Sequence, residues 1–240
     1  MKLTYIYHSC FVLEFKAFII IFDYFEDTQK ISENGLLHSE VLNNQKKIYV
    51  LSSHSHPDHF NLEILSWRLK RDNMQYILSK DILEAKLVPK EDAVFLDKKD
   101  SYKDNNLSIK AFGSTDIGIS FFIEAEGHKI FHAGDLNNWH WNEECEPEES
   151  KEYETNYLSE LDELAQEIKH LELAIFPVDP RLGKDYMRGA EQFISTISTD
   201  YFSPMHFDNA YDKAAAFEYY AKNKGCKVIK WKNKGECIEL

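Results

Sequence analysis

The sequence predicts an α/β protein built from two packed mixed β-sheets with helices on the outside. Short runs rich in β-branched and aromatic residues fill the first half of the chain, and helical patterns gather in later segments. A single parallel sheet would need a helix between nearly every pair of strands, and that order is absent. No repeat or low-complexity linker marks a second domain, so we expect one domain over residues 1–240.

Turn residues separate the expected strands of the first half, as in the ENG and AEGHK segments. In chain order these strands read KLTYIY, CFVLEF, AFIIIFD, KIYVLSS, QYILS, AVFLD, LSIKAFG, ISFFIEA and KIFHAGD. Two further short strands, KVIKW and CIEL, are expected at the end of the chain.

Helical spacing marks the remaining elements. Asn61 is a suitable N-cap for LEILSWRLK, whose three leucines would share one face. An acidic helix is expected from Glu148 to Leu171, with its charges on a solvated face. GAEQFISTIS and YDKAAAFEYYAKNKG predict two more helices, the second ended by Gly225.

Composition limits the classes of function. The formal charge of −13 argues against nucleic acid or an anionic membrane as partner, because both need a basic face. The start MKLTYIYHSCFVLEF lacks the features of a signal peptide, and FIIIF is too short to span a bilayer. We therefore expect a cytoplasmic protein with a small-molecule substrate. The sequence leaves open whether copies associate as a homo-oligomer.

The most informative stretch is the loop SSHSHPDHFN, which follows the strand KIYVL. His54 and His56 are separated by one residue, so extended backbone would project both imidazoles to the same side, where they can hold one metal ion. Asp58 and His59 follow where the chain turns into a helix and could hold a second ion. Pro57 stiffens the loop, which favours a site over an ordinary polar loop.

Two other strand ends offer further ligands. KIFHAGDLN runs into a glycine turn that presents Asp135, and DYFSPMHFDN brings His206 to the end of another strand. Carboxylate oxygen with imidazole nitrogen suits zinc, manganese or iron. A bridging position between two ions would explain the carboxylate of Asp135.

The order H-x-H-x-D-H, then G-D, then P-M-H-F resembles the metallo-β-lactamase fold superfamily. The segments HSCFVLE, FIIIFD, IFHAGD and SPMHF are similar to its cytoplasmic lactonase-like branch, which includes the ascorbate-6-phosphate lactonase. The resemblance covers nearly the whole chain. It implies a four-layer α/β/β/α sandwich with metals in a cleft at one edge of the two sheets.

The resemblance also implies a set of ligands and one or two divalent ions, zinc first and manganese or iron as alternatives. The first ion would use His54 and His56, the second Asp58, His59 and His206, and Asp135 would bridge them.

One departure concerns the third histidine that the family usually gives to the first ion. The corresponding turn reads FGSTDIGISF, with Ser114 in the histidine's place. Ser114 itself or Asp116 is then a possible substitute ligand, or a water takes the position. Otherwise the first site would be weakly occupied or empty.

The ions would activate a water for attack on a carbonyl or phosphoryl centre. Asp58 would orient that water or bind the second ion, and His8 or His140 are candidates to protonate the leaving group. Trp139 could form a wall of the pocket, or it could belong to the core.

The basic segment PVDPRLGKDYMRG adds three candidate contacts for an anionic substrate. Arg181, Lys184 and Arg188 would clamp a phosphate or carboxylate, or pair with the protein's own acids. Asp179 is a candidate for the rim of the cleft. His38, His128 and His170 are expected at ordinary surface positions.

The sequence thus predicts a metal-dependent hydrolase of a small anionic ester, lactone or phosphoester. One alternative is a nuclease or phosphodiesterase of the same superfamily. The other is a non-catalytic metal- or ligand-binding protein with a degenerate first metal site, which the serine at position 114 keeps open.

Overall fold

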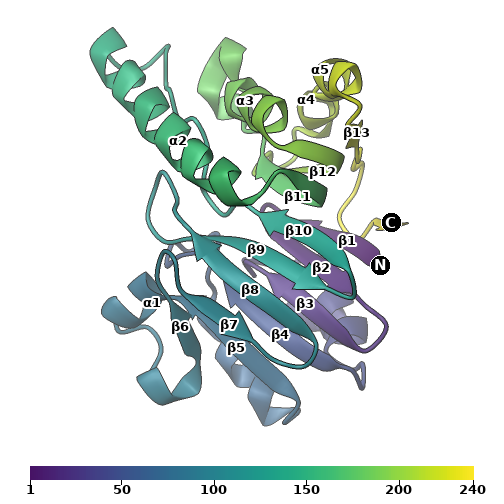
Figure 1. Ribbon diagram of the computed structural model, residues 1–240. Coiled ribbons are helices and arrows are strands. Elements are labelled where there is room, and N and C mark those ends of the chain that lie inside the picture. Colours follow the sequence, from purple (N-terminus) through teal and green to yellow (C-terminus); the bar gives the residue numbers. More distant parts are fainter. The chain divides into compact units, whose positions relative to one another are not determined.

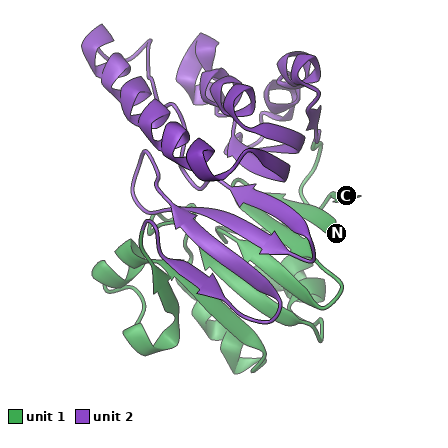
Figure 2. Ribbon diagram, in the orientation of Figure 1, with its two compact units in different colours: residues 1–97, 231–240 green, residues 98–230 purple.

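The computed structural model describes residues 1–240, which fold into two compact units (Figure 2). Unit 1 comprises residues 1–97 and 231–240, and unit 2 comprises residues 98–230. Each unit is built on one seven-stranded sheet. None of the helices combines the length and apolar character needed to cross a bilayer.

The sheet of unit 1 has the order β14-β1-β2-β3-β4-β5-β6 (Figure 1). Pairing is antiparallel from β14 to β3 and parallel from β3 to β6, so the sheet is mixed. Its strands are β1 (Lys2–Tyr7), β2 (Cys10–Glu14), β3 (Phe18–Phe22), β4 (Lys47–Ser52), β5 (Met74–Ser79), β6 (Val94–Leu96) and β14 (Cys237–Glu239).

Short helices cover one face of this sheet. They are η1 (Ser32–Asn34), the π-helix η2 (Leu37–Val41), η3 (Leu62–Leu69), α1 (Lys80–Glu84) and η4 (Lys90–Asp92). The β-branched residues Ile21 and Val50 pack in one buried cluster with Ile64 and Trp67 of η3. The alternate residues, such as Ile20, are also buried, so both faces of the central strands are apolar, as expected for parallel strands.

The sheet of unit 2 has the order β13-β12-β11-β10-β9-β8-β7 and is also mixed, because β7 to β10 pair antiparallel and β10 to β13 parallel. Its strands are β7 (Ser101–Lys103), β8 (Leu107–Phe112), β9 (Ser120–Ala125), β10 (His128–His132), β11 (His170–Pro177), β12 (Ser198–Met205) and β13 (Lys227–Val228). Its helices are α2 (Pro147–Glu167), η5 (Pro180–Asp185), α3 (Arg188–Thr196), α4 (Tyr211–Ala215), α5 (Glu218–Ala221) and η6 (Lys222–Lys224).

Aromatic side chains hold the helices of unit 2 to its sheet. Phe193 of α3 packs against Phe176 of β11 in a tilted arrangement, with ring centroids 4.6 Å apart, and stacks on Phe131 of β10 at 5.5 Å. Tyr157 of α2 is fully buried and donates a hydrogen bond to the carbonyl of Gly189, which joins α2 to α3. Such contacts give short helices a stability that their length alone would not supply.

The strands expected from the sequence are confirmed, although KVIKW forms a strand only at Lys227–Val228. Three helical predictions need correction. YDKAAAFEYYAKNKG forms the three short helices α4, α5 and η6 instead of one. The acidic helix ends at Glu167 instead of Leu171, because the apolar run that follows forms the central parallel strand β11. Asn61 caps its helix as predicted, accepting from the Glu63 N–H. That helix is a 3₁₀-helix, however, so residues three apart share a face: Ile64 and Trp67 are buried, and Leu62 and Leu69 are exposed.

The prediction that His38 lies on the surface is wrong, because its side chain is buried between two carboxylates. Its Nδ1 lies 2.8 Å from Asp27 Oδ2 and its Nε2 lies 2.7 Å from Glu63 Oε1. The hydrogen bond with Asp27 raises the pKa of His38 above its ordinary value, and burial opposes this rise only in part. A charged imidazole therefore ties the loop after β3 to η2 and η3.

This contact predicts a pH-dependent contribution to stability. A histidine whose pKa is higher in the folded than in the unfolded state stabilises the fold when it is charged. This stabilisation is complete below the unfolded-state pKa, about 6.5 for histidine. It is lost as the pH rises through the folded-state pKa. The difference in unfolding free energy between wild type and His38→Gln should therefore be largest at pH 5.5 and shrink towards pH 8.5. Urea unfolding of both proteins across this range checks it, and a difference independent of pH would contradict the charged state of His38.

Candidate metal centre

The histidine loop of unit 1 directly follows β4. Backbone hydrogen bonds from the N–H groups of His59 and Phe60 to the His56 carbonyl fold it into a tight turn. The rings of His54 and His56 have centroids 4.7 Å apart, and candidate ligand nitrogens of the two lie within 4.8 Å of each other. These two imidazoles are thus placed to bind one ion.

A second group in unit 1 forms where the same loop meets the turn between β1 and β2. His8, buried at that turn with φ of 54°, has its Nε2 3.4 Å from Asp58 Oδ2. His59 Nε2 lies 4.0 Å from the same oxygen. Candidate ligand atoms of these three residues lie within 4.8 Å of one another, so the structure brings His8 to the donors predicted for the second ion.

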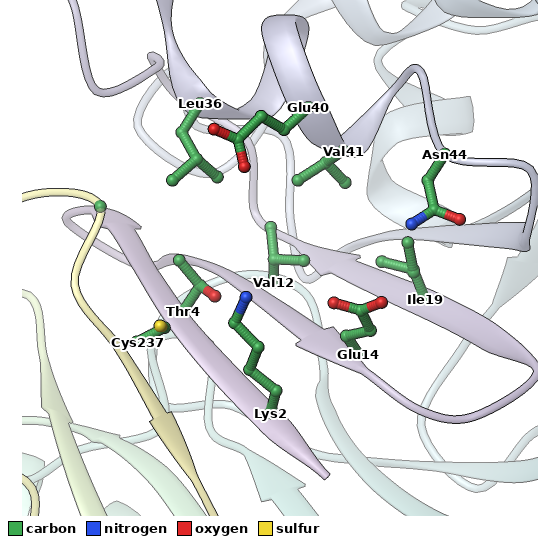
Figure 3. A pocket seen from close by; sticks show the side chains of 11 residues that line it. Lys2, Thr4, Val12, Glu14, Ile19, Leu36, Glu40, Val41, Asn44 and Cys237 are labelled. Carbon is green, nitrogen blue, oxygen red and sulfur yellow. The ribbon is translucent and has the colours of Figure 1, made fainter.

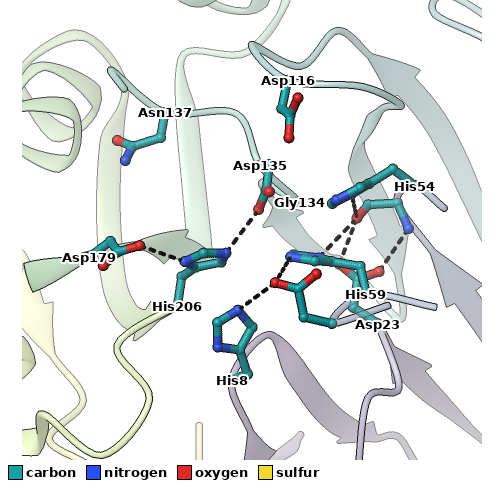
Figure 4. Close-up of polar contacts among 12 residues, drawn as sticks. His8, Asp23, His54, His59, Asp116, Gly134, Asp135, Asn137, Asp179 and His206 are labelled. Atoms are coloured by element: carbon teal, nitrogen blue, oxygen red, sulfur yellow. Dashed lines mark hydrogen bonds and ion pairs between the residues drawn. The ribbon is translucent and has the colours of Figure 1, made fainter. Parts of the chain in front are cut away.

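Sequence reasoning missed Asp23, the residue that orients this loop. It follows β3, is fully buried, and has φ of 40°. Its carboxylate accepts from the Ser53 N–H at 2.7 Å, from the Ser53 hydroxyl at 2.6 Å and from His59 Nδ1 at 2.7 Å (Figure 4). The proton therefore sits on Nδ1 of His59, which leaves the Nε2 lone pair as the ligand position. The sequence signal was an acid directly after an apolar strand.

In unit 2, three neighbouring parallel strands end at the same edge of the sheet, and each is followed by a site residue. Asp135 follows β10, Asp179 follows β11 and His206 follows β12. Gly134, with φ of 53°, permits the turn that presents Asp135, whose Oδ1 lies 3.5 Å from His206 Nε2. The two ligands that the sequence predicts for this unit therefore lie side by side (Figure 4).

Asp179 supports His206 much as Asp23 supports His59. Its Oδ2 lies 2.9 Å from His206 Nδ1 and 2.5 Å from Arg181 Nη2. Burial alone would raise the pKa of Asp179, but the hydrogen bonds from His206 and Arg181 outweigh it and hold the pKa at about 2. The carboxylate is ionised at neutral pH and directs the Nε2 lone pair of His206 towards Asp135.

The turn between β8 and β9 contains Ser114, at the position where the family usually has the third histidine, and Asp116 two residues later. The Ser114 hydroxyl oxygen accepts from the Asp116 N–H at 3.3 Å. Asp116 is exposed, and a candidate ligand oxygen of its carboxylate lies within 4.8 Å of one from Asp135. Of the two predicted substitutes, Asp116 is the one that brings a carboxylate to Asp135.

Trp139 and His140 are both engaged within unit 2. Trp139 is buried, donates from Nε1 to the Asp135 carbonyl at 2.8 Å, and has its ring 5.3 Å from that of His206. His140 Nε2 lies 3.1 Å from the Asp185 carbonyl, and its Nδ1 accepts from the Asn142 N–H. Burial lowers the pKa of His140, which keeps the ring neutral.

The predicted anion contacts lie around η5. Arg181 pairs with Asp179, and Arg188 Nη2 lies 2.7 Å from Asp185 Oδ2, so both arginines neutralise acids of their own unit. Lys184 is exposed. The alternative that these cations pair with the protein's own carboxylates is therefore realised for both arginines.

A separate cleft of about 110 Å³ opens on unit 1 (Figure 3). Its lining includes Lys2, Glu14, Glu40, Asn44 and Cys237, and it contains none of the predicted site residues.

Known proteins are similar to this chain over residues 2–150 by family model and over its full length by fold. A family model described as "Beta-lactamase superfamily domain" matches residues 2–150. No curated protein sequence matches. A metallo hydrolase from the archaeon Ignicoccus hospitalis has a similar structure, with TM-score 0.69, 19% identity, and coverage of 100% of this chain and 98% of that one.

Two further solved structures are similar over nearly all of this chain. A metallo-β-lactamase fold protein from Bacillus subtilis gives TM-score 0.64 at 10% identity, covering 99% of this chain and 98% of that one. A diiron β-hydroxylase from Streptomyces venezuelae gives TM-score 0.68 at 13% identity, covering 100% of this chain and 54% of that one. At these identities the similarity is one of fold.

Proposed function

This chain belongs to the β-lactamase superfamily, and from that premise we propose that it is a metal-dependent hydrolase. The predicted fold class is confirmed by the family model and by the solved structures, together with two mixed sheets that each carry helices. Membership in the lactonase-like branch stays a prediction.

The observation that carries the proposal is the chemistry of the donors at the strand ends of each unit. From the motif positions, His54 and His56 are the proposed ligands of the first ion, with Asp135 shared and Asp116 in place of the missing histidine. Ligands about 2 Å from one ion lie up to about 4 Å apart, so the observed spacings within each unit fit an ion after small side-chain movements.

From the motif positions, the second ion is proposed to be held by Asp58, His59 and His206, with Asp135 shared. Buried aspartates fix the protonation of two of these imidazoles, which supports a ligand role over an ordinary hydrogen-bonding role. We propose zinc as the native metal. The carboxylate share of the ligand set also suits manganese or iron.

When bound, such an ion supplies a nucleophilic water at neutral pH and an electrophile for the oxygen of the bond that is cleaved. The chain's own residues then have distinct tasks. The partly exposed Asp58 is placed to orient the attacking water, and His8 Nε2, 3.4 Å away, is placed to pass a proton to the leaving group.

The proposed substrate is a small ester, lactone or phosphoester. With both arginines of the η5 region paired to acids, Lys184 is the proposed contact for an anionic group on that substrate.

Metal analysis of the purified full-length protein, combined with hydrolysis assays, tests this function. The panel contains a lactone, a carboxylic ester, a phosphomonoester and a phosphodiester, each assayed before and after chelation and after addition of zinc, manganese or iron. We expect turnover of at least one substrate to fall about 100-fold or more on chelation and to return with one metal. Tight metal binding without turnover would favour the non-catalytic alternative, and turnover of the phosphodiester alone would favour the phosphodiesterase.

A further inference from the structure

Thr115 joins the two loops of unit 2 that carry its carboxylate donors. The turn after β8 carries Asp116, and the loop after β10 carries Asp135. The Thr115 hydroxyl donates to the Asn137 carbonyl at 2.6 Å, with the Asp135 carbonyl as a second, longer acceptor at 3.2 Å. Its oxygen accepts in turn from the Asn137 N–H at 2.9 Å. One side chain thus bonds to the backbone on both sides of Leu136.

These bonds act against an electrostatic force. Candidate ligand oxygens of Asp116 and Asp135 lie within 4.8 Å of each other, and two carboxylates at that distance repel (Figure 4). Other bonds fix each loop separately: Trp139 Nε1 donates to the Asp135 carbonyl, and Ser120 donates to the Gly113 carbonyl. Thr115 instead sets the distance from one loop to the other.

We propose that Thr115 is a positioning residue, which holds Asp116 and Asp135 at ligand spacing before a divalent ion binds. This inference rests on the proposed function. Holding the carboxylates in place removes the cost of ordering two loops from the binding step, so affinity for the ion rises. The methyl group of the threonine contributes packing and the hydroxyl the positioning, and substitutions separate the two.

The experiment titrates zinc into metal-free, full-length protein by calorimetry and records the visible spectrum of the cobalt(II) form. Thr115→Val keeps the shape and removes the hydroxyl, and Thr115→Ser keeps the hydroxyl. Thr199→Val is the matched control, because Thr199 is a buried threonine of β12 whose hydroxyl donates to the Ile197 carbonyl. Thermal unfolding of each metal-free protein monitors stability.

We expect Thr115→Val to weaken zinc binding about 10-fold and to change the cobalt spectrum, with Thr115→Ser within about twofold of wild type. Thr199→Val should leave affinity and spectrum unchanged. Equal affinity of Thr115→Val and wild type overturns the proposal. Thr115→Ser binding zinc as weakly as Thr115→Val also overturns it. A third contradicting outcome is that Thr199→Val loses zinc affinity as well, with the loss in each variant proportional to its loss of stability. If Thr115→Val does not fold, Thr115→Ala replaces it with the same expectation.

Asp135→Asn separates this inference from the function on which it rests. Wild-type protein that binds no zinc, or Asp135→Asn that binds it like wild type, overturns the proposed function and the role of Thr115 with it. Zinc binding that is lost in Asp135→Asn but unchanged in Thr115→Val overturns the role of Thr115 alone.

Discussion

Replacing either His56 in unit 1 or Asp135 in unit 2 is expected to remove the same metal ion and to abolish hydrolysis. The family resemblance assigns both residues to the first ion, His56 as an imidazole ligand and Asp135 as a shared carboxylate. Loss of one such ligand should cost more than the ~10–100-fold in metal affinity that loss of an outer-shell partner costs, and activity should fall ~1,000-fold or more. The fold should remain, because Pro57 and the backbone bonds of the turn do not depend on the His56 ring.

The variants His56→Ala and Asp135→Asn are compared for metal content by mass spectrometry, for turnover, and for secondary structure by circular dichroism. His170→Ala is the control, since His170 is an exposed histidine that pairs with Asp200. Loss of the same ion in both variants means that both units supply its ligands. Wild-type stoichiometry and turnover in either variant would refute the assignment of that residue as a ligand.

Replacing Asp23 by alanine is the second substitution with a large expected effect, and it acts on stability as well as on metal binding. Three donors lose their acceptor: the Ser53 N–H, the Ser53 hydroxyl and His59 Nδ1. All lie in a fully buried setting, so the free energy of unfolding should fall by about 3–5 kcal/mol. For a chain of this size that corresponds to a drop of roughly 10 °C in Tm.

Thermal unfolding of the metal-free protein measures the effect on stability separately from the effect on metal binding. Metal affinity should also fall by about 10–100-fold, because the His59 ring loses the partner that sets its tautomer and orientation. Asp97→Asn is the control, as Asp97 forms an exposed pair with Lys80. A metal-free Asp23→Ala protein with the melting temperature of wild type would show that this network does not stabilise the fold.

The parts of the site that could be predicted are those in which the chemistry lies within one short segment. The histidine loop and Asp135 are recognisable because metal-binding residue types directly follow apolar strands. The roles of Asp23 and Asp179 in orienting histidines could not be predicted from short segments, because their hydrogen-bond partners lie far along the chain. Asp23 meets a serine 30 residues away, and Asp179 meets His206 at a separation of 27 residues.

The same distinction explains the errors in the fold. Strand positions follow from local composition, and they were predictable. The burial of His38 depends on Asp27 and Glu63, which converge on it only in the folded unit. The exposed leucines of η3 result from a change in helical period that a hydrophobic pattern alone does not reveal.

Three residues of the proposed site occupy backbone that L-amino acids rarely adopt: φ is 54° at His8, 40° at Asp23 and 63° at His206. Each such residue costs on the order of 1 kcal/mol or more relative to a relaxed backbone. In this protein, strained backbone therefore coincides with residues of the proposed site. At Asp23 the three buried hydrogen bonds outweigh this strain, so selection for heat resistance alone should keep the aspartate. At His8 it should instead favour residues that tolerate positive φ, such as glycine or asparagine, and the resulting variants should be more stable and less active.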